Sequence, residues 1–152
     1  NEKVTSPMRL EAKKNDLTFP ESLILASIVE REGKTDEDRP IIAGILVNRL
    51  QADWPLQADA TLQYALGYQT KEKTWWKKEL FDEDKEVRSP YNTYLHTGLP
   101  PAPICNPGLS AIKAALYPKK SEYMYYIHDD KGIAHYATTL DEHNANVLQY
   151  LR

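Results

Sequence analysis

The feature that most constrains the fold is an uninterrupted apolar stretch, LILASIV, at residues 23–29. Thr18 and Glu21 precede it with the spacing of a capping box, and Gly33 follows its last turn. These signals predict a helix over about 19–32. Because its apolar side chains cover almost the whole circumference, we expect this helix to be buried in a core rather than to lie at the surface.

Further elements must surround such a helix. Other helices are predicted over residues 35–50, 59–67, 107–117 and 140–152. Residues 123–128 and 133–138 flank the turn sequence DDKG, which is typical of a β-hairpin. The order of elements therefore indicates an α+β fold that is mainly helical, with a small antiparallel sheet.

Length and composition exclude several classes of protein. A chain of 152 residues suits one domain. A net charge of −3, without a basic cluster, gives no support for nucleic-acid binding. The single cysteine, Cys105, rules out an intramolecular disulfide and a thiolate zinc site. No apolar run approaches the roughly 20 residues of a membrane span.

Three segments have no clear helical or strand period. Residues 1–17 are polar, and we interpret them as a linker or tail with one docked turn, before a domain over 18–152. Residues 68–88 are highly charged and are predicted to cross the surface. Residues 89–108 are proline-rich and are predicted to form a long ordered loop, a kind of segment that is often functional.

The sequence gives only weak support for a metal site or for a catalytic cysteine. The four histidines lack the helical pair spacing of a zinc site, so we expect no metal and no cofactor. Cys105 lies just before a predicted helix start, where a thiol pKa is lowered and the thiol becomes reactive. A free cysteine that packs as a small hydrophobe is the alternative explanation.

Two carboxylates at the end of the buried helix are stronger candidates for catalysis. Burial raises the pKa of an unpaired carboxyl group, which is the property that a general acid needs. Glu30 shares its face with small residues, among them Ala26 and Ser27, whereas Glu32 falls among larger apolar side chains. Periodicity alone does not choose between Glu30 and Glu32, and pairing with nearby arginines would explain either of them.

Five blocks, taken together and in this order, carry a resemblance to a known family. They are LILASIVEREG, DRPIIAGILVNRL, PLQADATLQYALG, SPYNTYLHTGLPPAPICNPGLSAIKAALYP and YMYYIHDDKGIAHYATTLDEHNANV. The chain resembles the catalytic domain of the YceG-like endolytic murein transglycosylases over about residues 20–150. The resemblance implies a lysozyme-like fold and a lyase that cuts bacterial peptidoglycan within its glycan strands. Such a lyase cleaves between N-acetylmuramic acid and N-acetylglucosamine and leaves a 1,6-anhydro-muramyl end.

The resemblance also implies site residues. The family's catalytic glutamate lies in an A-S-I-V-E block, which corresponds here to Glu30, acting as general acid and then as base. Blocks that line the family's cleft imply substrate contacts by Gln57, Asp59, Thr61, Tyr91, Asn92, Tyr94 and Asn106. Amides and phenols suit the N-acetyl and hydroxyl groups of sugars. Asp59 and Asn106 could equally cap helices, and Asn92 could serve a turn.

Location and partners follow from the same resemblance. We expect action on peptidoglycan glycan strands at the outer face of the bacterial cytoplasmic membrane, with the cell-wall synthesis machinery as a partner. Membrane attachment is expected only through an N-terminal anchor that this sequence does not contain. Two alternatives stay open: a non-catalytic peptidoglycan-binding module, and a cysteine peptidase that cuts stem peptides through Cys105.

Overall fold

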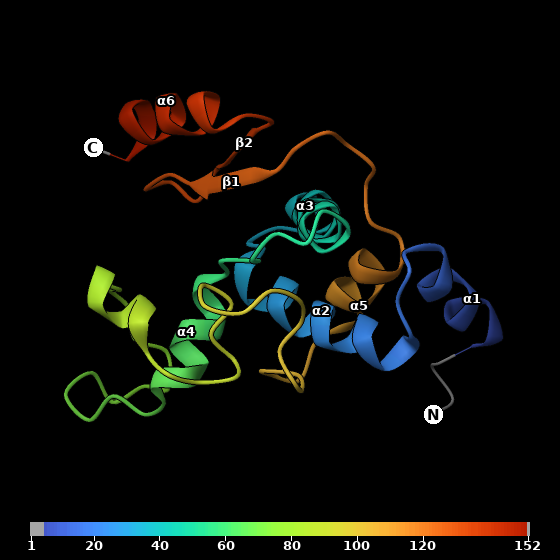
Figure 1. The fold of residues 1–152 in the computed structure, drawn as a ribbon, viewed down its shortest axis with the longest axis horizontal. Coiled ribbons are helices and arrows are strands. Elements are labelled where there is room, and N and C mark those ends of the chain that lie inside the picture. Colours follow the sequence, from blue (N-terminus) through green and yellow to red (C-terminus); the bar gives the residue numbers. More distant parts are fainter. Residues whose placement is uncertain (1–4, 152) are drawn as a thin grey trace.

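The computed structural model describes residues 5–151 and has an α+β fold, as the sequence predicts. Its elements in chain order are α1 (Ser6–Lys14), α2 (Phe19–Glu32), α3 (Asp38–Gln51), α4 (Asp59–Leu66), the short 3-10 helix η1 (Asp82–Glu86), α5 (Leu109–Leu116), β1 (Tyr125–His128), β2 (Ala134–Ala137) and α6 (Leu140–Tyr150). Figure 1 shows α2, α3 and α5 at the centre, with α1 at one end. The hairpin and α6 lie on one side of this centre, and α4 lies on the other.

The central helix α2 is the buried helix that the apolar stretch predicts. Leu25, Ile28 and Val29 are fully buried, and each such side chain contributes roughly 1.5–3 kcal/mol of hydrophobic stabilisation. The predicted capping box is present: the Glu21 N–H donates to Thr18 Oγ1, and the Thr18 N–H donates to Glu21 Oε2 at 2.7 Å. Helices α1, α3, α4 and α5 all pack against α2.

The N-terminal segment is more ordered than the sequence pattern indicates. Residues 6–14 form the helix α1 rather than one docked turn, and Ala12 is fully buried. The Asn15 side-chain amide donates to the Leu116 carbonyl oxygen at 3.1 Å, which ties the end of α1 to α5. A short polar helix gains its stability from such tertiary contacts, so its own sequence gives little signal. The first four residues of the predicted linker lie outside the described range.

Two helices begin later than predicted. Helix α3 begins at Asp38, and the Thr35 hydroxyl oxygen accepts a hydrogen bond from the Asp38 N–H at 3.1 Å. Helix α5 begins at Leu109 with Gly108 as its N-cap, rather than at residue 107. Helix α4 begins at Asp59 as predicted, but its N-cap is the preceding residue, so the Asp59 side chain does not cap the helix.

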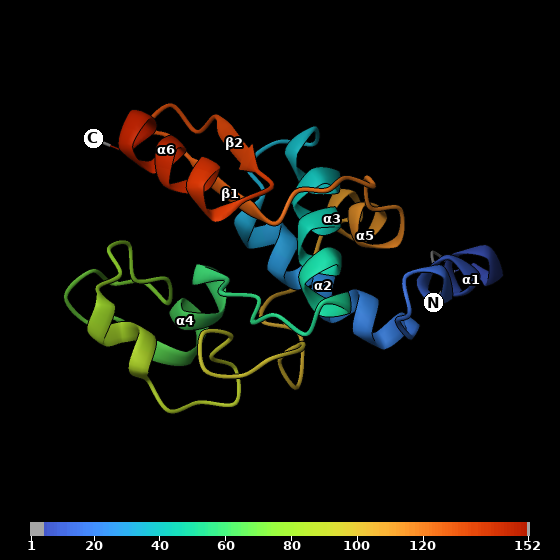
Figure 2. The ribbon, with the colours of Figure 1, turned by 45° about the horizontal axis from the view of Figure 1, so that its top comes forward.

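The hairpin and α6 form one unit. Strands β1 and β2 pair antiparallel, with Tyr125 opposite Ala137 and Ile127 opposite His135. The Asp129 carboxylate closes the turn by accepting the backbone N–H groups of residues 131 and 133. Helix α6 starts with the predicted capping box and lies along the hairpin in both views (Figures 1 and 2). This unit forms a wall beside the end of α2, and the cavity described next lies against it.

Candidate active site

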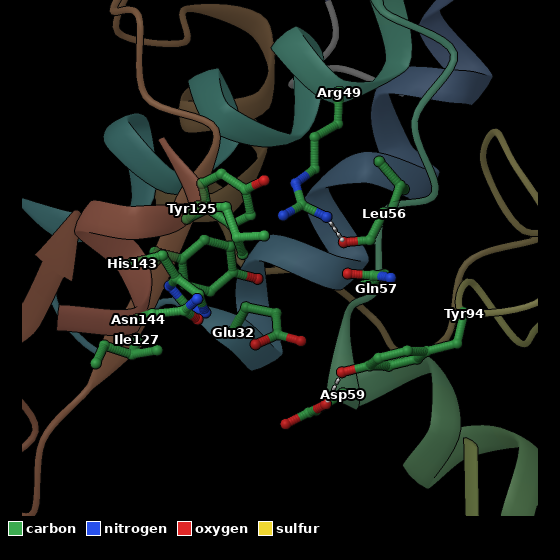
Figure 3. Close-up of a pocket in the computed structure, with 12 residues that line it drawn as sticks. Glu32, Arg49, Leu56, Gln57, Asp59, Tyr94, Tyr125, Ile127, His143 and Asn144 are labelled. Carbon is green, nitrogen blue, oxygen red and sulfur yellow. Dashed lines mark hydrogen bonds between the residues drawn. The ribbon is translucent and has the colours of Figure 1, made fainter. Parts of the chain in front are cut away.

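A cavity of about 380 Å³ lies between the hairpin unit and the start of α4 (Figure 3). Its walls come from the ends of α2 and α3, the loop before α4, the 89–108 loop, β1 and α6. The residues that line it are Glu32, Arg49, Leu56, Gln57, Asp59, Tyr94, Tyr125, Tyr126, Ile127, Leu140, His143 and Asn144. Phenols, amides, two carboxylates and one guanidinium give this cavity a polar character that suits hydroxyl-rich ligands.

Glu32 is the last residue of α2, and its carboxyl group points into the cavity (Figure 3). The Ala60 N–H donates to Glu32 Oε1 at 3.0 Å. Burial raises the pKa of Glu32 to about 7, the Ala60 N–H acts in the opposite direction, and the charge of Asp59 raises the pKa further. The carboxyl group is therefore divided between its acid and base forms near neutral pH.

Glu30 lies elsewhere. Two residues along a helix correspond to a rotation of about 200°, so Glu30 and Glu32 leave α2 on nearly opposite sides. Glu30 does not line the cavity. Its carboxylate accepts a hydrogen bond from the Gly108 N–H at 3.2 Å, at the start of α5. The structure thus separates the two carboxylates that the sequence pattern alone left equivalent.

Asp59 and Tyr94 form a pair on the wall opposite the hairpin. The Tyr94 O–H donates to Asp59 Oδ1 at 2.6 Å (Figure 3). Burial, and then the charge of Asp59, raise the pKa of the Tyr94 phenol, so it stays protonated and remains a donor. The structure therefore brings Asp59 and Tyr94 together at the cavity.

Gln57 also lines the cavity, and its backbone is unusual (Figure 3). Its φ angle is +50°, in the left-handed region that residues with a side chain rarely adopt. The Gln57 N–H donates to the Thr93 carbonyl oxygen at 3.1 Å, and the Ala58 N–H donates to Thr93 Oγ1 at 3.0 Å. Backbone strain of this kind is often found at functional sites, where the surrounding contacts hold it in place.

Two of the predicted substrate contacts are fully buried and lie outside the cavity. The Thr61 hydroxyl donates to the Ala58 carbonyl oxygen at 2.7 Å and contacts the Thr93 hydroxyl at 2.8 Å. The Asn92 amide donates to the carbonyl oxygens of Lys85 and Val87, both at 2.9 Å, and its oxygen accepts the N–H of the Tyr94 backbone. The buried hydrogen bonds of Thr61 and Asn92 therefore stabilise the 89–108 loop.

Two other predicted substrate contacts, Tyr91 and Asn106, also lie outside the cavity. Tyr91 is half-buried and packs on Tyr64, with ring centroids 4.7 Å apart. Asn106 is exposed, and because α5 begins three residues later it does not cap that helix. Neither residue lines the cavity, so of the seven predicted contacts the structure brings together Gln57, Asp59 and Tyr94.

Sequence reasoning did not single out several residues that line the cavity. These are Arg49, Tyr125, Tyr126, His143 and Asn144. The stretches YMYYIH and DEHNANV were the available signal, because both are rich in polar and aromatic side chains. The His143 ring stacks on Tyr125 with centroids 4.9 Å apart, and burial together with the Arg49 charge lowers the pKa of His143. His143 is therefore neutral at pH 7.

Cys105 does not have the surroundings of a nucleophile. Its thiol donates to the Ser27 carbonyl oxygen at 3.2 Å, and burial followed by the charge of Glu30 raises the pKa of the thiol. A reactive cysteine needs the opposite shift. Among residues 5–151, no group of side chains is arranged to hold a metal ion, and no helix is long and apolar enough to cross a membrane.

This fold is that of a known family. The chain belongs to the YceG-like family, which matches residues 1–149. It is 40% identical over 141 residues to the endolytic murein transglycosylase of Bacillus subtilis, covering 93% of this chain and 37% of that protein. It is 36% identical over 154 residues to the protein of the same name from Streptococcus pneumoniae serotype 2, covering 99% of this chain and 27% of that protein.

A solved structure has the same fold. The crystal structure of a YceG-like protein from Listeria monocytogenes superposes with a TM-score of 0.80 and 41% identity, over 92% of this chain and 44% of that chain. The chain thus spans less than half of the length of these relatives, and it corresponds to one part of them.

The buried position of Asn92 makes a first prediction. Replacing Asn92 by Ala removes three hydrogen bonds, one within the 89–108 loop and two to the segment just before it, and should lower the free energy of unfolding by about 2–4 kcal/mol. The exposed control Asn106→Ala should change it by less than about 0.5 kcal/mol. Urea unfolding measures both. An Asn92→Ala protein of unchanged stability that turns over more slowly would instead support a direct substrate contact.

Proposed function

We propose that this chain is the catalytic part of an endolytic peptidoglycan lytic transglycosylase that uses Glu32 as its general acid and then as its base. The substrate is the glycan strand, cut between N-acetylmuramic acid and N-acetylglucosamine to leave a 1,6-anhydro-muramyl end. The names of the relatives support the reaction class. The observation that carries the assignment of Glu32 is its carboxyl group in a polar cavity, with a pKa of about 7.

The proposed reaction needs one group that gives and then takes a proton. Protonated Glu32 donates its proton to the glycosidic oxygen as the bond from that oxygen to C1 of the muramic acid breaks. The resulting carboxylate then accepts the proton of the C6 hydroxyl of the same sugar, whose oxygen bonds to C1 and closes the anhydro ring. No water is consumed, and Glu32 returns to its protonated form. A pKa near the working pH serves both steps.

This proposal differs from the sequence prediction, which chose Glu30. The block A-S-I-V-E ends at Glu30, but Glu32 follows two residues later, so the two positions lie within one motif. Only Glu32 lines the polar cavity. Glu30 lies outside that cavity, where it accepts the Gly108 N–H before α5 and lies near the thiol of Cys105.

Three other cavity residues have proposed roles. Asp59, whose carboxylate lies near Glu32, would stabilise the positive charge that develops on the sugar ring. Tyr94 holds Asp59 in position through its 2.6 Å hydrogen bond. Gln57 would bind an N-acetyl or hydroxyl group of the glycan, because its side chain lies in the same cavity.

The presence of two carboxylates favours one second candidate, a glycoside hydrolase. Hydrolases commonly pair an acid with a second carboxylate that activates water or attacks the sugar. Glu32 and Asp59 could form such a pair, since both line one cavity. The products distinguish the two reactions, because a lyase product is lighter by one water than the hydrolase product.

Location and partners are also proposals. Action on murein would place the site outside the cytoplasmic membrane. Partners in the cell-wall synthesis machinery are proposed from the sequence resemblance alone.

Mass spectrometry of digested glycan strands tests the assignment. Glu32→Gln should abolish release of anhydro products, because an amide cannot donate and then recover the proton, whereas Glu30→Gln should retain at least about a third of the activity. Cys105→Ser should retain activity as well. If Glu30→Gln abolished activity and Glu32→Gln retained it, Glu30 would be the catalytic residue. Products heavier by one water than the anhydro form would indicate a hydrolase. Cleaved stem peptides would indicate the cysteine peptidase. A folded wild-type protein that binds strands but releases nothing would be a binding module.

The raised pKa of Glu32 makes a prediction about activity and pH. Activity should fall as pH rises through about 7, because the first step needs the protonated acid. Asp59→Asn removes a negative charge that raises the pKa of Glu32, so this fall should move to lower pH, by less than about one unit. A pH profile of kcat measures the shift. An unchanged midpoint would show that the Asp59 charge does not act on Glu32.

The same pKa has a consequence for stability. The pKa is raised from 4.5 to about 7, so the unfolded state loses its proton first, and Glu32 reduces stability as pH rises from about 4.5 to 7. Glu32→Gln should therefore increase the free energy of unfolding by about 1–3 kcal/mol at pH 8 and by little at pH 4. Urea unfolding at both pH values measures this, with Glu30→Gln as the matched control. Equal gains at both pH values would contradict the burial of a titrating Glu32.

A further inference from the structure

Arg49 is a buried cation in the cavity wall that the proposed chemistry does not use. Its side chain is only 7% exposed, and burial lowers the pKa of its guanidinium group. Within residues 5–151, no carboxylate lies within ion-pair distance of Arg49. Removing a cation from water without a counter-charge is unfavourable by several kcal/mol. A packing role alone would be served better by an apolar side chain.

The hydrogen bonds of Arg49 go to two separate segments. Its Nε donates to the carbonyl oxygen of Met124 at 2.7 Å, directly before β1. Its Nη1 donates to the carbonyl oxygens of Pro55 at 3.0 Å and Leu56 at 3.3 Å, directly before Gln57. One rigid, planar guanidinium therefore connects the two segments that supply opposite walls of the cavity (Figure 3).

Aromatic rings hold this group in its orientation. The guanidinium carbon lies 5.2 Å from the centroid of the Tyr125 ring and 6.0 Å from that of Trp54. Contacts of this kind are favourable for a cation and replace part of its lost hydration. The residue that follows the bonded carbonyl of Leu56 is Gln57, the residue with the left-handed φ of +50°. Arg49 thus fixes the carbonyl groups that lead into the strained backbone.

We propose that Arg49 is a positioning residue that sets the separation of the two cavity walls and holds Gln57 in its left-handed conformation, so that the substrate lies correctly against Glu32. This inference rests on the proposed function. Arg49 acts through the backbone of both walls and does not take part in proton transfer. A displacement of about 1 Å in such a site can reduce turnover by about two orders of magnitude.

The test is Arg49→Lys, which keeps the charge but replaces the planar fork with a single ammonium that cannot reach both walls in the same way. We expect kcat to fall about tenfold or more with KM within about threefold, because ground-state contacts with the glycan survive while alignment is lost. The matched control is Arg39→Lys. Arg39 also lies in α3 and bonds Asp36 and Ser110, away from the cavity.

Backbone amide hydrogen exchange gives a second measurement that needs no catalytic activity. Exchange should accelerate in Arg49→Lys at Gln57 and at residues 125–127 together, and at neither place in Arg39→Lys. A wild-type protein without lyase activity would defeat the proposed function but leave this exchange result intact. A folded Arg49→Lys protein with kcat within twofold of wild type, or with unchanged exchange at both walls, would overturn the positioning role.

Trp54→Leu is the second test variant, for use if the Arg49→Lys protein does not fold. Trp54 is partly exposed and does not line the cavity, so its replacement loosens one face of the guanidinium while all donors of Arg49 remain. We then expect kcat to fall about threefold or more, with faster exchange at Gln57. Unchanged kcat and exchange in this variant would overturn the proposal equally.

Discussion

The burial of α2 is the constraint on which the rest of the structure depends. The helix is enclosed by α1, α3, α4 and α5, so its rotation about its own axis is fixed by packing. That rotation decides where the side chains of its last turn lie, and Glu32 emerges beneath the hairpin wall rather than in open solvent. The same burial that stabilises the fold therefore raises the pKa of Glu32. Stability and the proposed chemistry have one common source.

Local signals predicted much of the fold. The capping boxes at Thr18 and Thr139 and the apolar stretch of α2 act within one or two turns, so the sequence alone is sufficient to predict those helices. The DDKG turn does the same for the hairpin. Helix α1 was missed because its one buried side chain, Ala12, and its contact with Leu116 depend on elements far along the chain. Long-range docking leaves no periodic pattern to detect.

The candidate site was predicted less completely, for the same physical reason. A helical wheel shows that Glu30 and Glu32 leave α2 on different sides, but not which side other elements cover. Glu30 accepts a hydrogen bond from the Gly108 N–H, whereas the hairpin and α4 leave a cavity beside Glu32. Asn92 has the residue type and loop position expected of a sugar contact, yet its partners lie five and seven residues earlier and face inward. Only the three-dimensional path of the loop distinguishes these cases.

Asp59 and Glu32 have different parts in the proposed reaction. The Tyr94 hydroxyl donates to Asp59 Oδ1 at 2.6 Å and so fixes the orientation of this carboxylate. Asp59 provides a negative charge. This charge raises the pKa of Glu32, which helps to keep Glu32 protonated, and it would stabilise a cationic sugar. In the proposed lyase reaction no water has to be activated, so proton transfer needs Glu32 alone.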